Sequence, residues 1–271
     1  MKNQPIGFMD SGVGGLTVVK EVMKQLPNEQ IYYIGDSARN PYGPRPMEEV
    51  HKFAHQLAQF LLKKNIKMLV IACNTATVAA LKTLQQVLPI PVIGVIESGT
   101  MAATQWTKNK NIGVIGTVGT IQSNEYEKQI TTQLDEVIVH SVACPRFVAI
   151  AEKNDFESSY AKEVVREELS LFKDTDIDTL VLGCTHYPLL QPIIQDYFGH
   201  QVNLVDPGVE TAKKIKKYLT NNDLLNDSIS KDQEHVFFTT GPVEQFQEIG
   251  SKWLGIGDIY VKNVDLEEFS E

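Results

Sequence analysis

The chain has 271 residues, and 25 Lys and Arg stand against 34 Asp and Glu, which gives a formal net charge of −9. This acidic balance without a basic cluster disfavours nucleic acid and anionic membrane surfaces as partners. We expect no membrane span, since the apolar runs are far shorter than about 20 residues, and no signal peptide. The three cysteines are too few for a disulfide framework, so we expect a cytoplasmic protein with free thiols.

Short apolar runs predict ten β-strands along the chain, most of them continuously apolar, as in parallel strands covered on both faces. In chain order the runs are Pro5–Met9, Gln30–Ile34, Lys67–Cys73, Pro91–Ile96, Asn111–Ile115, Glu136–Ala143, Thr179–Leu182, Gln201–Val205, His235–Thr239 and Asp258–Val261. Helical periodicity fills the intervals, most clearly in Met47–Lys63 and Tyr160–Phe172. Strands that alternate with helices predict an α/β fold with mostly parallel sheets, in which ligands bind at the carboxyl ends of the strands.

A weak internal repeat runs through the chain. PIGFMDSGVGG from Pro5 resembles NIGVIGTVGT from Asn111, and LVIACNTA around Cys73 resembles LVLGCTHY around Cys184. A third pair, VIESG and VDPG, follows in the same order at nearly the same spacing. The repeat predicts two pseudo-symmetric α/β domains.

The strands after about Asp206 have no counterpart in the repeat, so we expect them to return and complete the first sheet. The predicted first domain is therefore discontinuous and consists of residues 1–97 plus 207–271. Residues 98–206 form the predicted second domain.

Two of the three cysteines occupy equivalent positions in this repeat. Cys73 and Cys184 each end an apolar strand and precede polar residues that favour a helix start. A helix N-terminus favours the thiolate, so this position predicts a lowered pKa for each thiol. Cys144 precedes Pro145 and has no counterpart in the first half, so we interpret it as structural.

Two opposed thiols suit one class of reaction in particular. One thiolate removes a proton from one face of a carbon, and the other thiol delivers a proton to the opposite face, with the roles exchanged in the reverse direction. The pattern therefore favours racemisation or epimerisation.

Five strings of the sequence resemble the bacterial glutamate racemases of the aspartate/glutamate racemase superfamily, in that family's order and across nearly the whole chain. They are GFMDSGVGGLTV from Gly7, NPYG from Asn40, ACNTAT from Ala72, IGTVGT from Ile115 and GCTHYPLL from Gly183. The resemblance implies two α/β domains with the active site between them, no cofactor, no metal and a homodimer. It also implies an isomerase that interconverts L- and D-glutamate and supplies D-glutamate for peptidoglycan and the cell wall.

The resemblance also assigns roles to residues. Cys73 and Cys184 match the two catalytic cysteines, and Asp10, Glu152 and His186 match the polar residues that assist them, with Asp10 beside Cys73 and His186 beside Cys184. The substrate-binding pairs match Asp10 with Ser11, Tyr42 with Gly43, Asn74 with Thr75 and Thr185 with His186, and Thr117 and Thr120 match a turn of the second half. These residue types suit an amino-acid substrate, because helix N-termini bind carboxylates and side-chain oxygens accept hydrogen bonds from an ammonium group.

Other classes of function compete with this interpretation. A dinucleotide-binding enzyme is suggested by the glycines at 12 and 14 and by Asp36, although Thr17 stands where the third glycine belongs. Cys184 and His186 would suit a metal site, but no second Cys/His pair completes a structural zinc centre. A two-domain binding protein has similar lobes without needing matched thiols. An aspartate racemase is the alternative within the superfamily, and His186 favours glutamate.

Overall fold

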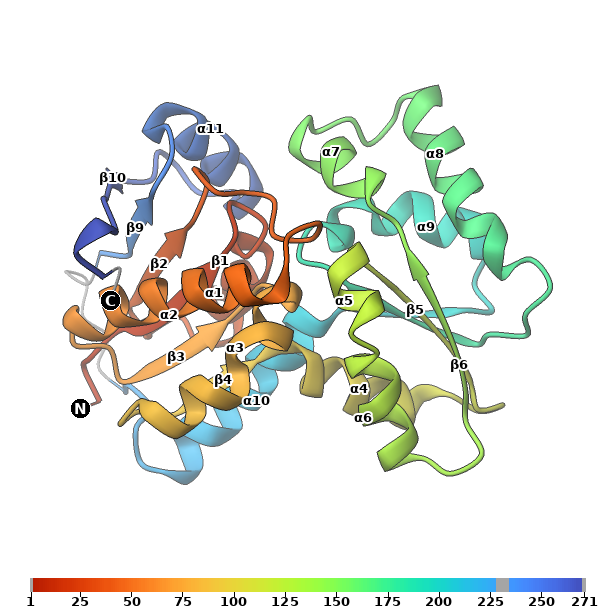
Figure 1. The fold of residues 1–271 in the computed structure, drawn as a ribbon, viewed down its shortest axis with the longest axis horizontal. Helices are drawn as coiled ribbons and strands as arrows, with labels where there is room; N and C mark the ends of the chain where they lie inside the picture. The colour runs from red at the N-terminus through yellow and green to blue at the C-terminus, as the bar shows by residue number, and fades with distance from the viewer. Residues whose placement is uncertain (1, 228–233, 270–271) are drawn as a thin grey trace.

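The computed structural model describes residues 2–227 and 234–269, and Figure 1 shows them as two lobes, each with a sheet between helices. The first sheet has the strand order β10-β9-β2-β1-β3-β4 and is parallel throughout. Its strands are β1 (Ile6–Asp10), β2 (Ile31–Gly35), β3 (Met68–Ile71), β4 (Val92–Gly94), β9 (Val236–Thr239) and β10 (Val261–Asn263).

The second sheet is also parallel and has the order β6-β5-β7-β8. Its strands are β5 (Asn111–Gly116), β6 (Ile138–Ala143), β7 (Thr179–Gly183) and β8 (Asn203–Val205). Each of the ten predicted strands therefore overlaps an observed one. The prediction for Pro91–Ile96 was wrong at its end, because Val95 and Ile96 already belong to a helix.

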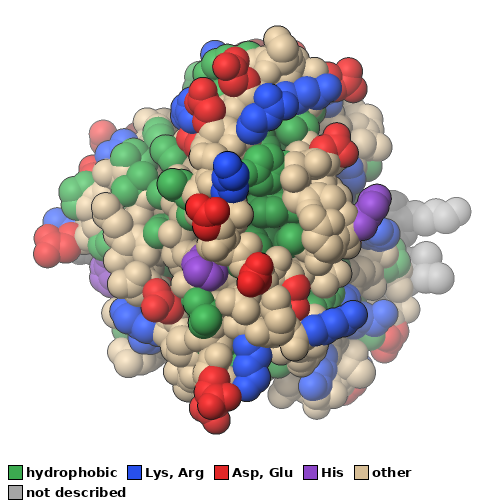
Figure 2. All heavy atoms as spheres, turned by 90° about the vertical axis from the view of Figure 1, so that its right-hand side faces the viewer, with side chains coloured by type: hydrophobic (Ala, Val, Ile, Leu, Met, Phe, Trp, Pro, Cys, Tyr) green, Lys and Arg blue, Asp and Glu red, His purple; other side chains and the backbone are tan. Residues whose placement is uncertain are grey.

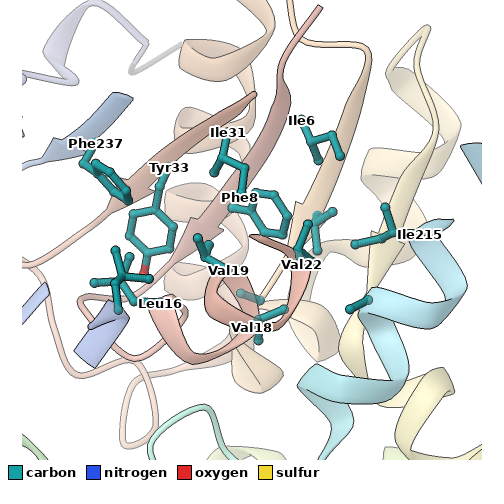
Figure 3. Close-up of a cluster of buried hydrophobic side chains, with 14 of the residues drawn as sticks. Ile6, Phe8, Leu16, Val18, Val19, Val22, Ile31, Tyr33, Ile215 and Phe237 are labelled. Atoms are coloured by element: carbon teal, nitrogen blue, oxygen red, sulfur yellow. The ribbon is translucent and has the colours of Figure 1, made fainter. Parts of the chain in front are cut away.

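Helices cover both faces of the first sheet. One face carries α1 (Leu16–Gln25), α10 (Pro207–Asn221) and α11 (Val243–Leu254), and the other carries α2 (Met47–Lys63) and α3 (Asn74–Val87). Figure 3 shows the core on the α1 face, where Phe8 and Tyr33 lie among aliphatic side chains of α1 and α10. We call this sheet with its five helices the first half.

The second sheet is covered in the same way. Its faces carry α4 (Val95–Trp106) and α6 (Glu125–Gln133) on one side and α7 (Arg146–Glu152), α8 (Ser159–Leu169) and α9 (Gln191–Phe198) on the other. The short helices α5 (Val118–Gln122), η1 (Ser170–Phe172), η2 (Tyr187–Leu190) and, beyond β10 in the first half, η3 (Glu267–Phe269) complete the description. We call this sheet with α4 to α9 the second half, and the contact region between the halves the seam.

This arrangement explains the continuously apolar strands, because a strand buried on both faces has no solvent side. The observed mixed α/β fold with two parallel sheets confirms the predicted fold class. The late strands β9 and β10 do join the first sheet, next to β2. The boundaries 1–97 plus 207–271 and 98–206 stay a prediction.

The surface is mixed in charge. On the face in Figure 2, acidic and basic side chains of the described residues are interspersed, and no large patch of one sign is visible there. No helix within the described part of the chain is long and apolar enough to cross a membrane.

A buried ion pair ties three segments of the first half together. Lys67 and Glu29 lie 2.5 Å apart, with side chains essentially inaccessible to solvent. The Lys67 ammonium group also donates to the carbonyl groups of Lys2 and Leu224, and Glu29 accepts from the backbone N–H of Asn226. The pair therefore fixes the N-terminal segment and the segment after α10 against the first sheet.

Lys67→Met should destabilise the protein by about 3–5 kcal/mol, because it leaves the Glu29 carboxylate buried without its counter-charge. Urea denaturation followed by circular dichroism measures the free energy of unfolding. Lys67→Met combined with Glu29→Leu should recover much of the loss. Lys2→Met is the matched control, since its ion pair with Asp223 is exposed, and it should change stability little. Equal losses in Lys67→Met and Lys2→Met would contradict the assignment.

Candidate active site

Both repeat-matched cysteines lie at the carboxyl end of a central strand. Cys73 follows β3 and is the N-cap of α3, where its sulfur accepts from the backbone N–H of Ala76 at 3.4 Å. Cys184 follows β7 and precedes the 3₁₀ turn η2, with Pro188 in the first turn. The two strand-to-helix turns that the sequence predicts are therefore present, although the second opens with a 3₁₀ turn.

A cavity of about 20 Å³ lies at the seam and is bordered by both thiols. Its other walls include Ser11, Asn74 and Thr75 of the first half and Thr117, Thr185 and His186 of the second. Tyr42 and Gly43 also border it, whereas Asp10 and Glu152 are not among the residues that line it. The structure thus gathers the residues singled out from the sequence around one small space.

The Cys184 side carries a chain of polar contacts. The sulfur lies 3.8 Å from Nδ1 of His186, and Nε2 of His186 lies 3.2 Å from Oε1 of Glu152. The same carboxylate oxygen accepts from the side-chain amide of Asn40, across the seam, at 3.1 Å. A thiol, an imidazole and a carboxylate in series form the arrangement in which a base takes the proton of a nucleophile and is oriented by a third group.

The environment sets the charge of this imidazole. Burial by itself would lower the pKa of His186, but the hydrogen bonds with Cys184 and Glu152 outweigh it and raise the pKa to about 10. Burial opposes ionisation of Glu152 as well, yet the hydrogen bond and the charge of His186 lower the pKa of that carboxyl group. The pair therefore favours an imidazolium next to a carboxylate at neutral pH.

The Cys73 side is different. Burial, reinforced by the nearby Asp10 charge, raises the pKa of Cys73 to about 12, although the Ala76 N–H and the Ser11 hydroxyl oppose the shift. The predicted lowering of the pKa of this thiol at a helix start was wrong, because one helix end does not compensate the loss of water around a fully buried sulfur. Cys73 is therefore a thiol at neutral pH in this state of the site.

Asp10 ends β1 beside this thiol and is almost inaccessible to solvent. One carboxylate oxygen, Oδ2, accepts from the backbone N–H of Gly12 at 3.1 Å. The other, Oδ1, is buried and has no hydrogen-bond partner among the described residues. Burial raises the pKa of Asp10, and the charge of His186 opposes the rise. Oδ1 is thus available to a donor that enters the site.

Side-chain oxygens and amides complete the walls. The Asn74 carbonyl oxygen accepts from the Tyr126 hydroxyl at 2.7 Å, which leaves the Asn74 N–H groups as the donors of this amide. The Thr75 hydroxyl lies 2.9 Å from that of Thr117 and 3.2 Å from that of Thr120. All these bonds cross the seam.

Tyr42 differs from the expectation for a substrate-binding side chain. It borders the cavity, but its hydroxyl donates to the buried carboxylate of Asp36, which also accepts from Arg39 and Thr240. The segment around Tyr42 therefore presents its backbone and the Tyr42 ring to the cavity. Asp36 accepts the hydrogen bonds that hold this segment in place, which is a structural role and not that of a ribose-binding carboxylate.

Three residues that contact the site residues were given no role from the sequence. Asn40 lay inside a quoted motif but was given no role, although it contacts Glu152. Tyr126, which contacts Asn74, and Trp253, whose ring packs against His186, had no sequence signal, because their contacts join segments far apart in the chain.

Glycines allow the halves to approach closely at the seam. A Cβ atom on Gly14 would lie 2.3 Å from the Thr185 hydroxyl oxygen and 2.6 Å from Cε1 of His186. The Gly119 N–H donates to the Gly43 carbonyl at 2.9 Å, where the loop before α2 reaches the second half (Figure 1).

The thiol of Cys144 lies away from the cavity, fully buried, and burial raises its pKa well above the ordinary range. The described residues contain no group of three or more His, Cys, Asp and Glu that would hold a metal ion.

Comparison with known proteins is consistent with this site. Residues 6–215 match the family model described as Asp/Glu/Hydantoin racemase. A Carnobacterium sp. (strain St2) protein named glutamate racemase is 54% identical over 98% of this chain and 100% of its own length. The crystal structure of glutamate racemase isoform RacE1 from Bacillus anthracis has a TM-score of 0.95 at 47% identity and covers 98% of this chain and 99% of that one. The Francisella tularensis glutamate racemase in complex with D-glutamate has a TM-score of 0.91 at 37% identity, with coverage of 99% and 100%.

Gly14→Ala should lower turnover by about 100-fold or more, because the new methyl group displaces Thr185 and His186 from the seam and misplaces the reacting groups. Steady-state kinetics with the amino-acid substrate measures the loss. Gly257→Ala is the matched control, since a Cβ atom there meets nothing within 4 Å. Unchanged turnover in Gly14→Ala would show that the halves do not need this close approach.

His186 should make stability fall with rising pH. The pKa of His186 is about 10 in the folded protein, against 6.5 for the unperturbed side chain of the unfolded chain. The contribution of His186 to the free energy of unfolding is therefore complete below pH 6.5 and is lost as the pH rises through about 10. Between pH 7 and pH 10 the wild type should therefore lose more of its free energy of unfolding than His186→Asn. The buried Cys73 and Cys144 thiols act in the same direction in both proteins. Parallel pH curves from denaturant titrations would refute this assignment.

Proposed function

The chain belongs to the Asp/Glu/Hydantoin racemase family, and we propose that it interconverts L- and D-glutamate without a cofactor, using Cys73 and Cys184 as its two acid/base groups. The observation that carries this proposal is the cavity at the seam, which two thiols from repeat-matched strand ends border together. Racemisation is the reaction for which one base on each side of a carbon is needed. The 54% identity to a protein named glutamate racemase supports glutamate over aspartate.

The chemistry follows from the two sides of the site. One sulfur, as thiolate, takes the Cα proton, so that the Cα–H bond breaks and an S–H bond forms. The other sulfur, as thiol, gives its proton to the opposite face of the resulting carbanion. In the reverse direction the two sulfurs exchange roles. His186, as an imidazolium beside Glu152, stabilises the Cys184 thiolate when that sulfur acts as the base, while Cys73 supplies the proton as a thiol.

The walls of the site fit the charges of glutamate. The N-termini of α3 and α5, the Asn74 amide and the threonine hydroxyl groups supply donors for the carboxylates. The unpartnered Asp10 Oδ1 and the Ser11 hydroxyl accept from the ammonium group. Fixed donors in a site that excludes water stabilise the developing carbanion without having to reorient.

Substrate entry requires the halves to move. A space of about 20 Å³ holds about one water molecule, which is far less than glutamate needs. We propose that the halves open at the seam, admit the substrate and close again, which excludes water during the proton transfers. The cavity in this structure thus represents the closed arrangement.

The wider setting follows from the resemblance and the composition. We propose that the protein acts in the cytoplasm as a homodimer and supplies D-glutamate for peptidoglycan. The net charge of −9 supports the absence of nucleic acid and membrane partners.

Cys73→Ala and Cys184→Ala should each lower racemisation of either enantiomer by at least about 10³-fold, because each removes one of the two acid/base groups. Circular dichroism of glutamate solutions, with no cofactor added, follows the reaction, and mass spectrometry in D₂O detects deuterium at Cα. Cys144→Ala is the matched control and should retain nearly full activity, since that thiol does not border the cavity. Full activity in either of the first two variants would exclude the two-thiol mechanism, and an aspartate preference in a substrate panel would exclude the proposed specificity.

A further inference from the structure

Trp253, near the end of α11, belongs to the first half but contacts the second. Only 5% of its surface is exposed. Its ring centroid lies 5.8 Å from that of His186, with the two planes at 90°. Its indole N–H donates to the side-chain oxygen of Asn154 at 2.8 Å. The sequence analysis gave this residue no role, and the two-thiol mechanism does not use it.

Asn154 connects this tryptophan to Glu152, the carboxylate in the relay formed by Cys184, His186 and Glu152. It lies two residues after Glu152, in the turn that ends α7, and its backbone N–H donates to the carbonyl of Ala151. Its φ of 52° is left-handed, a conformation that asparagine adopts more readily than most residues. The bond from Trp253 therefore fixes the turn that carries Glu152.

The imidazole of His186 meets Trp253 by ring packing, without a hydrogen bond between the two rings. Nδ1 faces the sulfur of Cys184 and Nε2 faces Glu152, so both nitrogen atoms have partners. The indole packs against the remaining ring surface, and His186 is left 3% exposed. An aromatic ring perpendicular to the imidazole restricts its rotation and keeps water away from it.

Trp253 is itself firmly held in the first half. Its ring belongs to the core cluster that includes Leu16 and Phe246, and its carbonyl accepts from the Lys20 ammonium group at 2.9 Å. Because Trp253 and these two partners belong to different halves, the proposed opening at the seam would break the contact with His186 and Asn154.

We propose that Trp253 is a positioning residue, which aligns His186 and Glu152 with Cys184 each time the halves close. It acts through these two residues and does not border the cavity. The inference rests on the proposed racemisation. It makes the two sides of the reaction unequal, because the imidazole and carboxylate that Trp253 aligns belong to the Cys184 side.

The test uses Trp253→Phe, which keeps a ring but removes the N–H, and Asn154→Ala, which removes the acceptor and leaves the indole. Each should lower kcat/KM about fivefold, the loss expected for one hydrogen bond of about 1 kcal/mol. The double variant should lose no more than either single variant, because both remove the same bond. Since the two enantiomers have equal free energy, kcat/KM must fall equally for both.

The primary isotope effect with α-deuterated glutamate separates positioning from a general structural role. When proton transfer at Cys184 slows, the isotope effect on kcat/KM should rise for the enantiomer that Cys184 deprotonates and fall for the other. Cys184→Ser identifies which enantiomer that is, because it produces the same pattern more strongly. Loss of general packing would instead move both isotope effects in the same direction or leave both unchanged.

Trp106→Phe is the matched control and the parent for fluorescence, because Trp106 is 40% exposed at the end of α4 and the chain has only two tryptophans. In that variant the emission of Trp253 should shift when glutamate binds, while racemisation is unchanged. Unaltered kinetics in both Trp253→Phe and Asn154→Ala, or isotope effects that move together, would overturn the inference while the wild type still racemises glutamate. An inactive wild type would instead overturn the proposed function.

Discussion

The site depends on the burial of one imidazole between a thiol and a carboxylate. A charged ring removed from water is costly unless its polar atoms have partners. Both nitrogen atoms of His186 have them, and Glu152 has a further donor in Asn40 across the seam. Cys184, His186 and Glu152 all belong to the second half, so closure of the halves adds the Asn40 donor to this series of contacts, and in the proposed mechanism it also excludes water from them.

The internal repeat explains where the two sulfur atoms lie, but it does not explain the chemical environment of each. Each follows a central strand of a parallel sheet, and the two sheets bring both to one cavity. Their neighbours differ, since Cys73 has a hydroxyl and a buried carboxylate where Cys184 has an imidazole. In the proposed racemisation, a symmetric reaction would thus run between chemically unequal groups, and the Asp10 and His186 environments would have to compensate for that difference.

Periodicity and repeat matching were sufficient for the strands and for the positions of Cys73 and Cys184, because both depend on local patterns. The pKa of Cys73 was mispredicted, since a helix start is visible in sequence whereas complete burial is a property of the assembled halves. The positions of Tyr126 and Trp253 were not predictable for the same reason. Their partners, Asn74 and Asn154, are distant in the chain, and no spacing rule connects them.

The distribution of strong and weak contacts is consistent with opening at the seam. The buried pair of Lys67 and Glu29 lies wholly within the first half, where nothing has to move. Across the seam, the ion pair of Lys214 in α10 with Glu97 in α4 is partly exposed, and Asn40 donates to the Glu152 carboxylate. The bonds from Tyr126 to Asn74, between the threonine hydroxyl groups and from Trp253 to Asn154 join neutral groups. Each such bond contributes only about 0.5–1.5 kcal/mol. Several of them fix one closed geometry together, yet none of these neutral bonds by itself would prevent the proposed opening. A fully buried charged pair at the seam would hold the closed state more tightly than the partly exposed pair of Lys214 and Glu97 does, and in the proposed reaction it would slow release of the product.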